Sequence, residues 1–190
     1  NGMKHGKEIK YFENETISYE ANYKNDLLHG TETFYKFNGD IITKIEYKYN
    51  KYDGKYIVYN ENFPILEITY KKGVKDGSYN EYFETGMLKE SAVYKRGKIE
   101  NIKKEYYESG TLRSEINYND GVVDGLGRYY YEDGKLLAEG LFSNGIRIGS
   151  WKTYNENSKI SFIENYSNNQ EDIERGNTWN KISSCLNRSN

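Results

Sequence analysis

Residues 119–142 read NDGVVDGLGRYYYEDGKLLAEGLF, and the same pattern returns along most of the 190-residue chain. When the copies are aligned on Gly125, equivalent positions are separated by 24, 24, 23, 24, 24 and 24 residues. These anchor positions are Gly6, Gly30, Gly54, Gly77, Asn101, Gly125 and Gly149. A period in this range indicates stacked supersecondary units rather than one ordinary globular core. The sequence therefore predicts seven tandem repeats, numbered here from the N-terminus.

Two columns of aromatic residues follow from this alignment. The first column lies five residues after each anchor and consists of Tyr11, Tyr35, Tyr59, Tyr82, Tyr106, Tyr130 and Tyr154. The second column lies seven residues before the following anchor and consists of Tyr23, Tyr47, Tyr70, Tyr94, Tyr118 and Phe142, continued by Tyr166. Such side chains can pack between adjacent hairpins, where an aromatic pair contributes about 0.2–1 kcal/mol. They can also line a groove for a protein segment or a glycan, so both columns are candidate binding residues.

A turn position recurs eight or nine residues after each anchor. Glycine or asparagine occupies it, and both tolerate a positive φ angle. The residues are Asn14, Gly39, Asn62, Gly86, Gly110, Gly134 and Asn157. The segment after each turn alternates between apolar and polar residues, as in residues 112–118, which is typical of a strand. Each repeat therefore reads as strand, tight turn, strand, and the anchor glycines are interpreted as a second set of turns that joins the hairpins.

The predicted fold is all-β. Residues 1–166 are expected to form an elongated antiparallel meander of about seven tandem β-hairpins, as a single twisted sheet or an open solenoid. The third repeat is one residue shorter and contains Pro64, so local irregularity is expected there. The pattern stops after Tyr166. In residues 167–190, Trp179, Ile182 and Leu186 have roughly helical spacing, and a short capping helix and a disordered tail are the two alternatives.

Composition and charge exclude several classes of function. A net charge of −2 and a pI near 5.9 give no basic footprint for nucleic acid. No apolar run approaches the roughly 18 residues of a membrane span. No leader is recognisable, so a cytoplasmic location and an envelope location after removal of an upstream signal both stay open. Cys185 is the only cysteine, which excludes an internal disulfide framework. His5 and His29 have no third ligand nearby, so neither a metal nor a cofactor is expected.

A column of glutamates lies seven residues after the anchors. It consists of Glu13, Glu61, Glu84, Glu108, Glu132 and Glu156. At the start of a hairpin turn these carboxylates are expected to cap the amides of the turn itself. The alternative is an acidic ridge that attracts a basic partner. Catalysis by paired carboxylates would require a closed pocket that raises one pKa, and a repeated sheet surface predicts none.

The motif Tyr-x-x-Gly-x-x-x-Gly, seen from Tyr70 to Gly77, resembles the bacterial variant of the MORN (membrane occupation and recognition nexus) repeat. Tandem arrays of this variant form a family often labelled YwqK-type antitoxins of toxin–antitoxin pairs. The resemblance extends roughly from Gly2 to Tyr166 and departs from the pattern at Asn101, Asp26 and Asn50, where a glycine is replaced. It implies a repeated β-hairpin fold and an interaction role, without chemistry.

The sequence thus predicts a non-enzymatic scaffold, since it has neither a phosphate-binding loop nor a catalytic-loop motif. The first hypothesis is a protein-binding module, with neutralisation of a cognate toxin as its specific form. The alternative is a module that binds the cell envelope or carbohydrate through its tyrosines. Binding of lipid head groups is a remote alternative, because it would need more positive charge. Self-association through the open sheet edges is also compatible with the pattern.

Overall fold

The computed structural model describes residues 2–166. The expected capping helix or tail, with Trp179, Ile182, Cys185 and Leu186, lies outside the described residues. Within residues 2–166 every regular element is a β-strand, and no helix there is long and apolar enough to cross a membrane.

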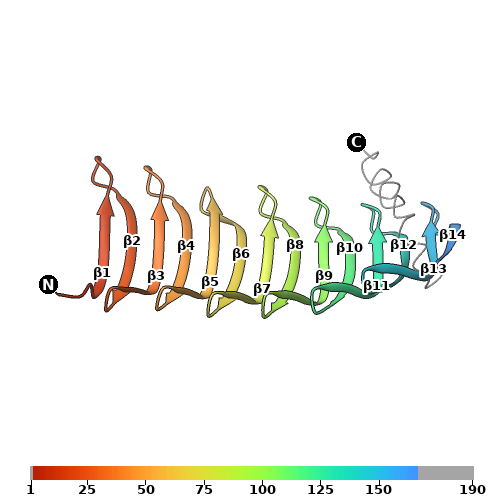
Figure 1. Cartoon of the computed structure of the whole chain (residues 1–190). Helices are drawn as coiled ribbons and strands as arrows, with labels where there is room; N and C mark the ends of the chain where they lie inside the picture. The colour runs from red at the N-terminus through yellow and green to blue at the C-terminus, as the bar shows by residue number, and fades with distance from the viewer. Residues whose placement is uncertain (1, 167–190) are drawn as a thin grey trace. The chain divides into compact units, whose positions relative to one another are not determined.

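Fourteen strands make up the described chain, two from each repeat (Figure 1). They are β1 (Gly6–Tyr11), β2 (Ile17–Lys24), β3 (Leu27–Tyr35), β4 (Ile41–Lys48), β5 (Lys51–Asn60), β6 (Phe63–Lys71), β7 (Val74–Tyr82), β8 (Leu88–Lys95), β9 (Lys98–Tyr106), β10 (Leu112–Asn119), β11 (Val122–Tyr130), β12 (Leu136–Ser143), β13 (Ile146–Tyr154) and β14 (Ile160–Tyr166). They form one open sheet whose strand order is the sequence order. Each strand whose register is described here runs antiparallel to its neighbour, so the predicted fold class is confirmed.

The chain divides into two compact regions, and the boundary between Glu100 and Asn101 falls within β9. We call them the first region (residues 1–100) and the second region (residues 101–190), and each is described by itself. The first region contains β1 to β8, and the second contains β10 to β14 together with most of β9.

The hairpin loop within each full-length repeat is a type I turn followed by one residue with positive φ. In the sixth repeat, the amide of Tyr131 donates to the carbonyl of Lys135 at 2.8 Å, and the amide of Gly134 donates back to the carbonyl of Tyr131 at 2.9 Å. Gly134 has φ 84°, which suits the left-handed position of a three-residue hairpin loop. Gly39, Gly86 and Gly110 occupy the same position with φ between 83° and 90°.

Two of the predicted turn residues are wrong by one position. In the first and seventh repeats the positive φ belongs to Glu15 (64°) and Ser158 (57°), not to Asn14 and Asn157. Asn14 instead accepts a hydrogen bond from the amide of Thr16 through its side chain, at 3.2 Å. An asparagine beside the left-handed position therefore stabilises the turn by capping an amide.

The third repeat closes its hairpin differently. Glu61 and Asn62 both have positive φ, 48° and 68°, which is the geometry of a two-residue type I′ turn. Asn60 pairs with Phe63 across this turn, and Pro64 pairs with Tyr59 near the start of β6. The missing residue is thus removed from the loop, and the strands on either side keep their pairing.

The anchor glycines lie inside or at the start of strands, which corrects their assignment to turns. All of them have positive φ: Gly6, Gly30, Gly54, Gly77, Gly125 and Gly149. Gly77 illustrates the reason, because Ile68 pairs with Tyr79 and Tyr70 with Lys75, so that three residues oppose Thr69 alone. This is a β-bulge, where a positive φ absorbs the extra residues. A Cβ on Gly77 would lie 2.8 Å from the Cβ of Thr69, so the position also requires glycine for space.

The turns between hairpins lie four or five residues before the anchors. Asp120 and Gly121 have φ angles of 51° and 85°, and this pair forms a type I′ turn between β10 and β11. The glycine replacements at Asp26 and Asn50 keep positive φ, 65° and 62°. Asn101 does the same at an anchor, with φ 64°. These departures from the repeat pattern therefore preserve the backbone conformation.

One face of the sheet carries the core, and we call it the aromatic face because the second aromatic column lies on it. In the first region its buried residues are Ala21, Ile45, Ile68 and Ala92. In the second region Tyr129, Leu137, Ala138, Phe142 and Trp151 form a buried cluster. The indole of Trp151 lies flat over Gly140, where a Cβ would overlap it. Residues that alternate with the core residues lie on the opposite face, the polar face.

Candidate functional site: the aromatic face and its edges

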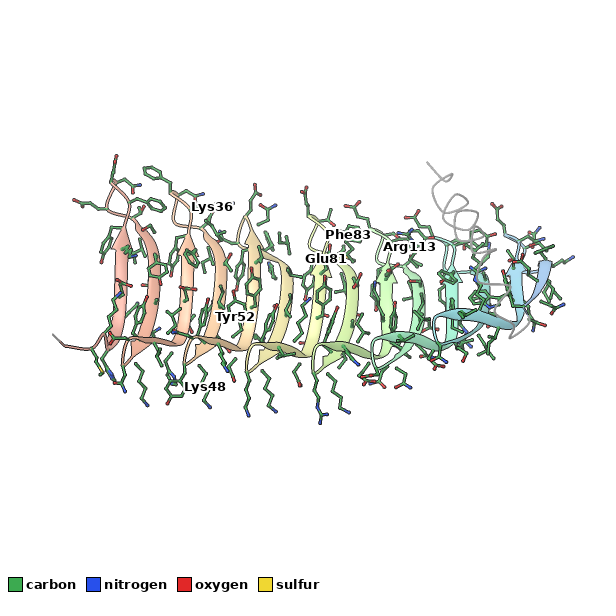
Figure 2. The ribbon with its side chains drawn as sticks, viewed as in Figure 1. Lys36, Lys48, Tyr52, Glu81, Phe83 and Arg113 are labelled. Atoms are coloured by element: carbon green, nitrogen blue, oxygen red, sulfur yellow. The ribbon has the colours of Figure 1, made fainter. Side chains whose placement is uncertain are left out.

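Tyrosine rings form a continuous chain on the aromatic face of the first region. Tyr52 contacts Tyr47 and Tyr70, each with ring centroids 5.1 Å apart, and Tyr56 contacts Tyr70 at 6.2 Å. The interplanar angles of these contacts are 61°, 63° and 66°, the edge-to-face geometry that aromatic pairs prefer. Figure 2 shows Tyr52 on β5. Tyr52 and Tyr56 belong to neither predicted column, so the structure adds them to the candidate surface.

A second aromatic pair lies on β7 and β8. The rings of Tyr79 and Tyr94 are 5.8 Å apart, and the ammonium of Lys75 lies 5.2 Å and 5.0 Å from their centroids. A cation placed over ring faces in this way contributes about 0.5–1 kcal/mol at an exposed site. The aromatic surface of the first region therefore includes a positive charge.

A buried carboxylate on β3 lies among the aromatic rings of this face. Glu32 is 7% exposed and accepts a hydrogen bond from the hydroxyl of Tyr19 at 2.9 Å. The pKa of Tyr19 and that of Tyr47 are both raised, mainly by burial and further by hydrogen bonding that includes Glu32. The phenols thus stay protonated and serve as the donors that a buried carboxylate needs.

The first aromatic column lies on the polar face, so the structure does not bring the two columns together. Four of its hydroxyls donate to a glutamate fifteen residues earlier in the chain: Tyr35 to Glu20 (3.1 Å), Tyr82 to Glu67 (3.1 Å), Tyr130 to Glu115 (2.8 Å) and Tyr154 to Glu139 (3.0 Å). Each bond ties a strand to the hairpin before it. Tyr11, at the chain start, is 60% exposed, and the other six members are half-buried.

These glutamates were missed by the sequence reasoning, although a signal was present. They recur at the repeat spacing, on the polar side of the second strand of their hairpins. In the second region Arg128 joins two of them, because its guanidinium lies 3.2 Å from Glu115 and 3.3 Å from Glu139. These carboxylates raise the pKa of Arg128 through hydrogen bonds. The polar face is therefore held by its own side chains, which favours a structural role for the first column.

The two ends of the strands differ in charge in the first region. The hairpin loops at one end carry the exposed members of the glutamate column, Glu13, Glu61 and Glu84. In the turn that contains Glu13 a neighbouring residue caps the amide, since the amide of Thr16 donates to the side chain of Asn14 at 3.2 Å. The type I′ turns at the other end carry exposed cations: Lys24, Lys48, Lys51, Lys71, Lys72, Lys95, Arg96 and Lys98. Lys48 points away from this edge in Figure 2.

Comparison with known protein families agrees with this geometry. Six segments match the MORN repeat variant: residues 4–25, 28–49, 75–96, 99–120, 123–144 and 147–168. Together they cover more than half of the chain. The chain belongs to the MORN repeat variant family. Among curated proteins, none matches the sequence significantly.

The seven hairpins of the described chain outnumber the six matched segments. Residues 50–74 are not matched, and they contain the whole third hairpin, β5 and β6, with its shortened turn. MORN repeats are generally scaffolds for interaction with proteins or membranes, and they are repeat modules rather than a known enzyme family. The aromatic face and the charged edges are the surfaces on which such an interaction can be sought.

Proposed function

We propose that this MORN repeat protein binds another protein through the aromatic face of its first region. The observation that carries the proposal is the chain of rings formed by Tyr47, Tyr52, Tyr56 and Tyr70, which are half-buried on a sheet face. No second layer of described residues covers this face. A sheet with one apolar face is stabilised by packing that face against another element, and a partner can supply it.

The side-chain types on this face favour a protein over a glycan. Tyrosine and arginine are enriched among residues that dominate binding energy at protein interfaces, and tyrosine offers a large rigid surface at low entropic cost. The rings pack edge to face against one another, at 61–66°, so they do not form the flat platform on which a sugar ring could stack. Binding to cell-envelope polysaccharide is therefore the second candidate. Neutralisation of a toxin is the narrower form of protein binding that the resemblance implies.

The proposal is tested by affinity capture from a cell lysate, with polysaccharide binding measured in parallel. The wild-type chain should retain a protein partner, and Tyr52→Ala should weaken that binding by about 2 kcal/mol or more, as for an interface hot spot. Tyr11→Ala is the matched control, since Tyr11 is exposed and lies on the polar face. Circular dichroism establishes that both variants stay folded. Retention on insoluble polysaccharide alone, lost in Tyr52→Ala, would replace the proposal by its alternative.

A further inference from the structure

One position in the repeat links adjacent hairpins in the second region. It lies six residues after the anchor and holds Tyr107 in the fifth repeat and Tyr131 in the sixth. The hydroxyl of Tyr107 donates to the carbonyl of Tyr130 at 2.8 Å, and that of Tyr131 donates to the carbonyl of Tyr154 at 2.9 Å. We call this the bridging position, because each ring spans from its own loop to the next hairpin.

The surroundings of the bridging rings follow the repeat. Arg113 lies beside Tyr107, with its guanidinium 5.9 Å from the ring centroid. The pKa of Tyr107 is raised mainly by burial, and the negative charge of Glu132 in the next loop raises it further. Tyr131 packs against the cluster that contains Leu137, the equivalent of Arg113. The ring of Tyr107 is thus bordered by Arg113 of its own hairpin and by Tyr130 and Glu132 of the next.

The third repeat has no bridging ring. Its bridging position is Asn60, and its loop is one residue shorter. A cleft of about 410 Å³ lies at this place, lined by Asn60, Ile65, Leu66, Tyr79, Glu81, Tyr82 and Glu84. We call it the Asn60 cleft. The pairing of Pro64 with Tyr59, and of Leu112 with Tyr106, makes Ile65 the equivalent of Arg113.

Three residues that line the Asn60 cleft correspond to the residues around the bridging ring of Tyr107. Ile65 is equivalent to Arg113 in the repeat. Tyr82 and Glu84 follow their anchor by the same number of residues as Tyr130 and Glu132 follow theirs. The cleft is therefore the space that the chain fills with its own tyrosine in the fifth and sixth repeats. In the third repeat asparagine is too short to occupy it.

We infer that the Asn60 cleft receives the tyrosine side chain of a protein partner, flanked in the partner by a basic residue. Ile65, Leu66 and the ring of Tyr79 supply apolar walls, and the carbonyl of Tyr82 corresponds to the acceptor that the bridging hydroxyls use. The volume falls within the roughly 300–1,000 Å³ of ligand pockets. This inference rests on the proposed function, since it adds an anchor site for the bound protein.

Charge at the rim specifies the flanking residue. Glu81 and Glu84 both line the cleft. Glu81 is paired with Lys89 at 2.5 Å and accepts a hydrogen bond from Tyr79 at 3.1 Å, whereas Glu84 lies on the exposed loop. Figure 2 shows Glu81 and Phe83 toward the loop end of β7. A cation beside the partner's tyrosine would meet Glu84, and complementary charge favours that orientation.

The experiment uses tyramine, a phenol with an attached ammonium, and p-cresol, the phenol alone. Both are titrated into the isotope-labelled chain while backbone amide resonances are followed. Saturable shifts are expected at Asn60, Leu66 and Tyr82. Asn60→Tyr should fill the cleft and raise the Kd for tyramine at least about tenfold. Lys36→Tyr, the same change at the bridging position of the second repeat, lies outside the cleft, is the matched control and should bind tyramine as the wild type does.

Glu84→Gln separates the two parts of the inference. It should weaken tyramine binding several-fold and leave p-cresol binding unchanged. Absence of saturable shifts at the cleft in the wild type would overturn the inference, as would equal binding by Asn60→Tyr provided that this variant is folded. Either result leaves the proposed function standing if affinity capture still retains a protein through Tyr52. If the chain captures no protein but still binds tyramine in the cleft, the proposed function is overturned and the cleft remains a phenol-binding site.

Discussion

At the scale of single residues, the glutamates bonded to the first column explain why tyrosine recurs there. A phenylalanine could fill the same space, but only tyrosine donates a hydrogen bond to the carboxylate fifteen residues earlier. The bonds are partly buried, where an unmade hydrogen bond is costly. The column is thus a repeated cross-strand tie, and the candidate binding surface is left to the other face.

Tyr130→Phe is expected to lower the free energy of unfolding by about 0.5–1.5 kcal/mol, the usual contribution of one hydrogen bond. The lost bond is the one that the hydroxyl of Tyr130 donates to Glu115 at 2.8 Å. The measurement is urea denaturation followed by circular dichroism. Tyr11→Phe serves as the control, because Tyr11 is 60% exposed. Equal destabilisation by both changes would contradict this assignment.

At the scale of the element, two positions with positive φ shape each β-hairpin, one in its loop and one in its bulge. The bulge at Gly125 opposes Asn117 alone, since Ile116 pairs with Gly127 and Tyr118 with Val123. Bulges increase local twist and fix the register of the paired strands. They therefore decide which side chains reach each face.

Gly125→Val is expected to destabilise the second region by at least about 1–3 kcal/mol, the range for a residue held in a sparsely populated backbone region. Its φ is 105°, and a Cβ would approach the Cβ of Asn117 to 3.1 Å. Thermal melting compared with Gly2→Val gives the measurement, because a Cβ on Gly2 meets nothing within 4 Å. An unchanged melting temperature for Gly125→Val would show that the bulge tolerates a side chain.

At the scale of the whole molecule, tyrosines with raised pKa occur in both regions. They are Tyr19, Tyr35, Tyr47, Tyr59, Tyr70, Tyr79, Tyr82, Tyr107, Tyr129, Tyr130, Tyr154 and Tyr166. Burial is the first cause in each of them, because it disfavours the charged phenolate. The buried tyrosines of both regions should therefore all resist deprotonation at alkaline pH in the folded chain.

Stability is expected to fall as pH rises from about 10 to about 12. Burial raises the pKa of Tyr129 and of Tyr130 to about 12, whereas unfolded tyrosine titrates near about 10. Below a pH of about 10 these phenols are protonated in both the folded and the unfolded chain, so their contribution to stability is complete. Above that pH the phenols of the unfolded chain lose their protons first, which lowers the free energy of unfolding. Tyrosinate absorbance and urea denaturation across this range provide the measurement. Titration of every phenol near pH 10 without loss of stability would contradict it.

The sequence by itself determined the repeat, the hairpins and the loops within the hairpins, but it assigned the turns between hairpins to the anchor glycines, which lie in strands. The reason is that backbone conformation is local: a glycine or asparagine at a fixed offset, with alternation on both sides, specifies strand and turn within one repeat. The same local rules accounted for Asp26, Asn50 and Asn101, which keep the positive φ of the glycines they replace.

Only the tertiary structure decided what depends on pairing between strands. Whether the anchor glycines sit in turns or bulges, and on which face each aromatic column lies, follows from register across neighbouring strands. The bonds from Tyr35 to Glu20 and from Tyr107 to Tyr130 join residues 15 and 23 positions apart. The Asn60 cleft likewise lies where the third repeat lacks the tyrosine that the fifth and sixth repeats carry at the bridging position. A pattern read along the chain records which residue is present, but the space left by an absent side chain is defined only by the hairpins packed around it.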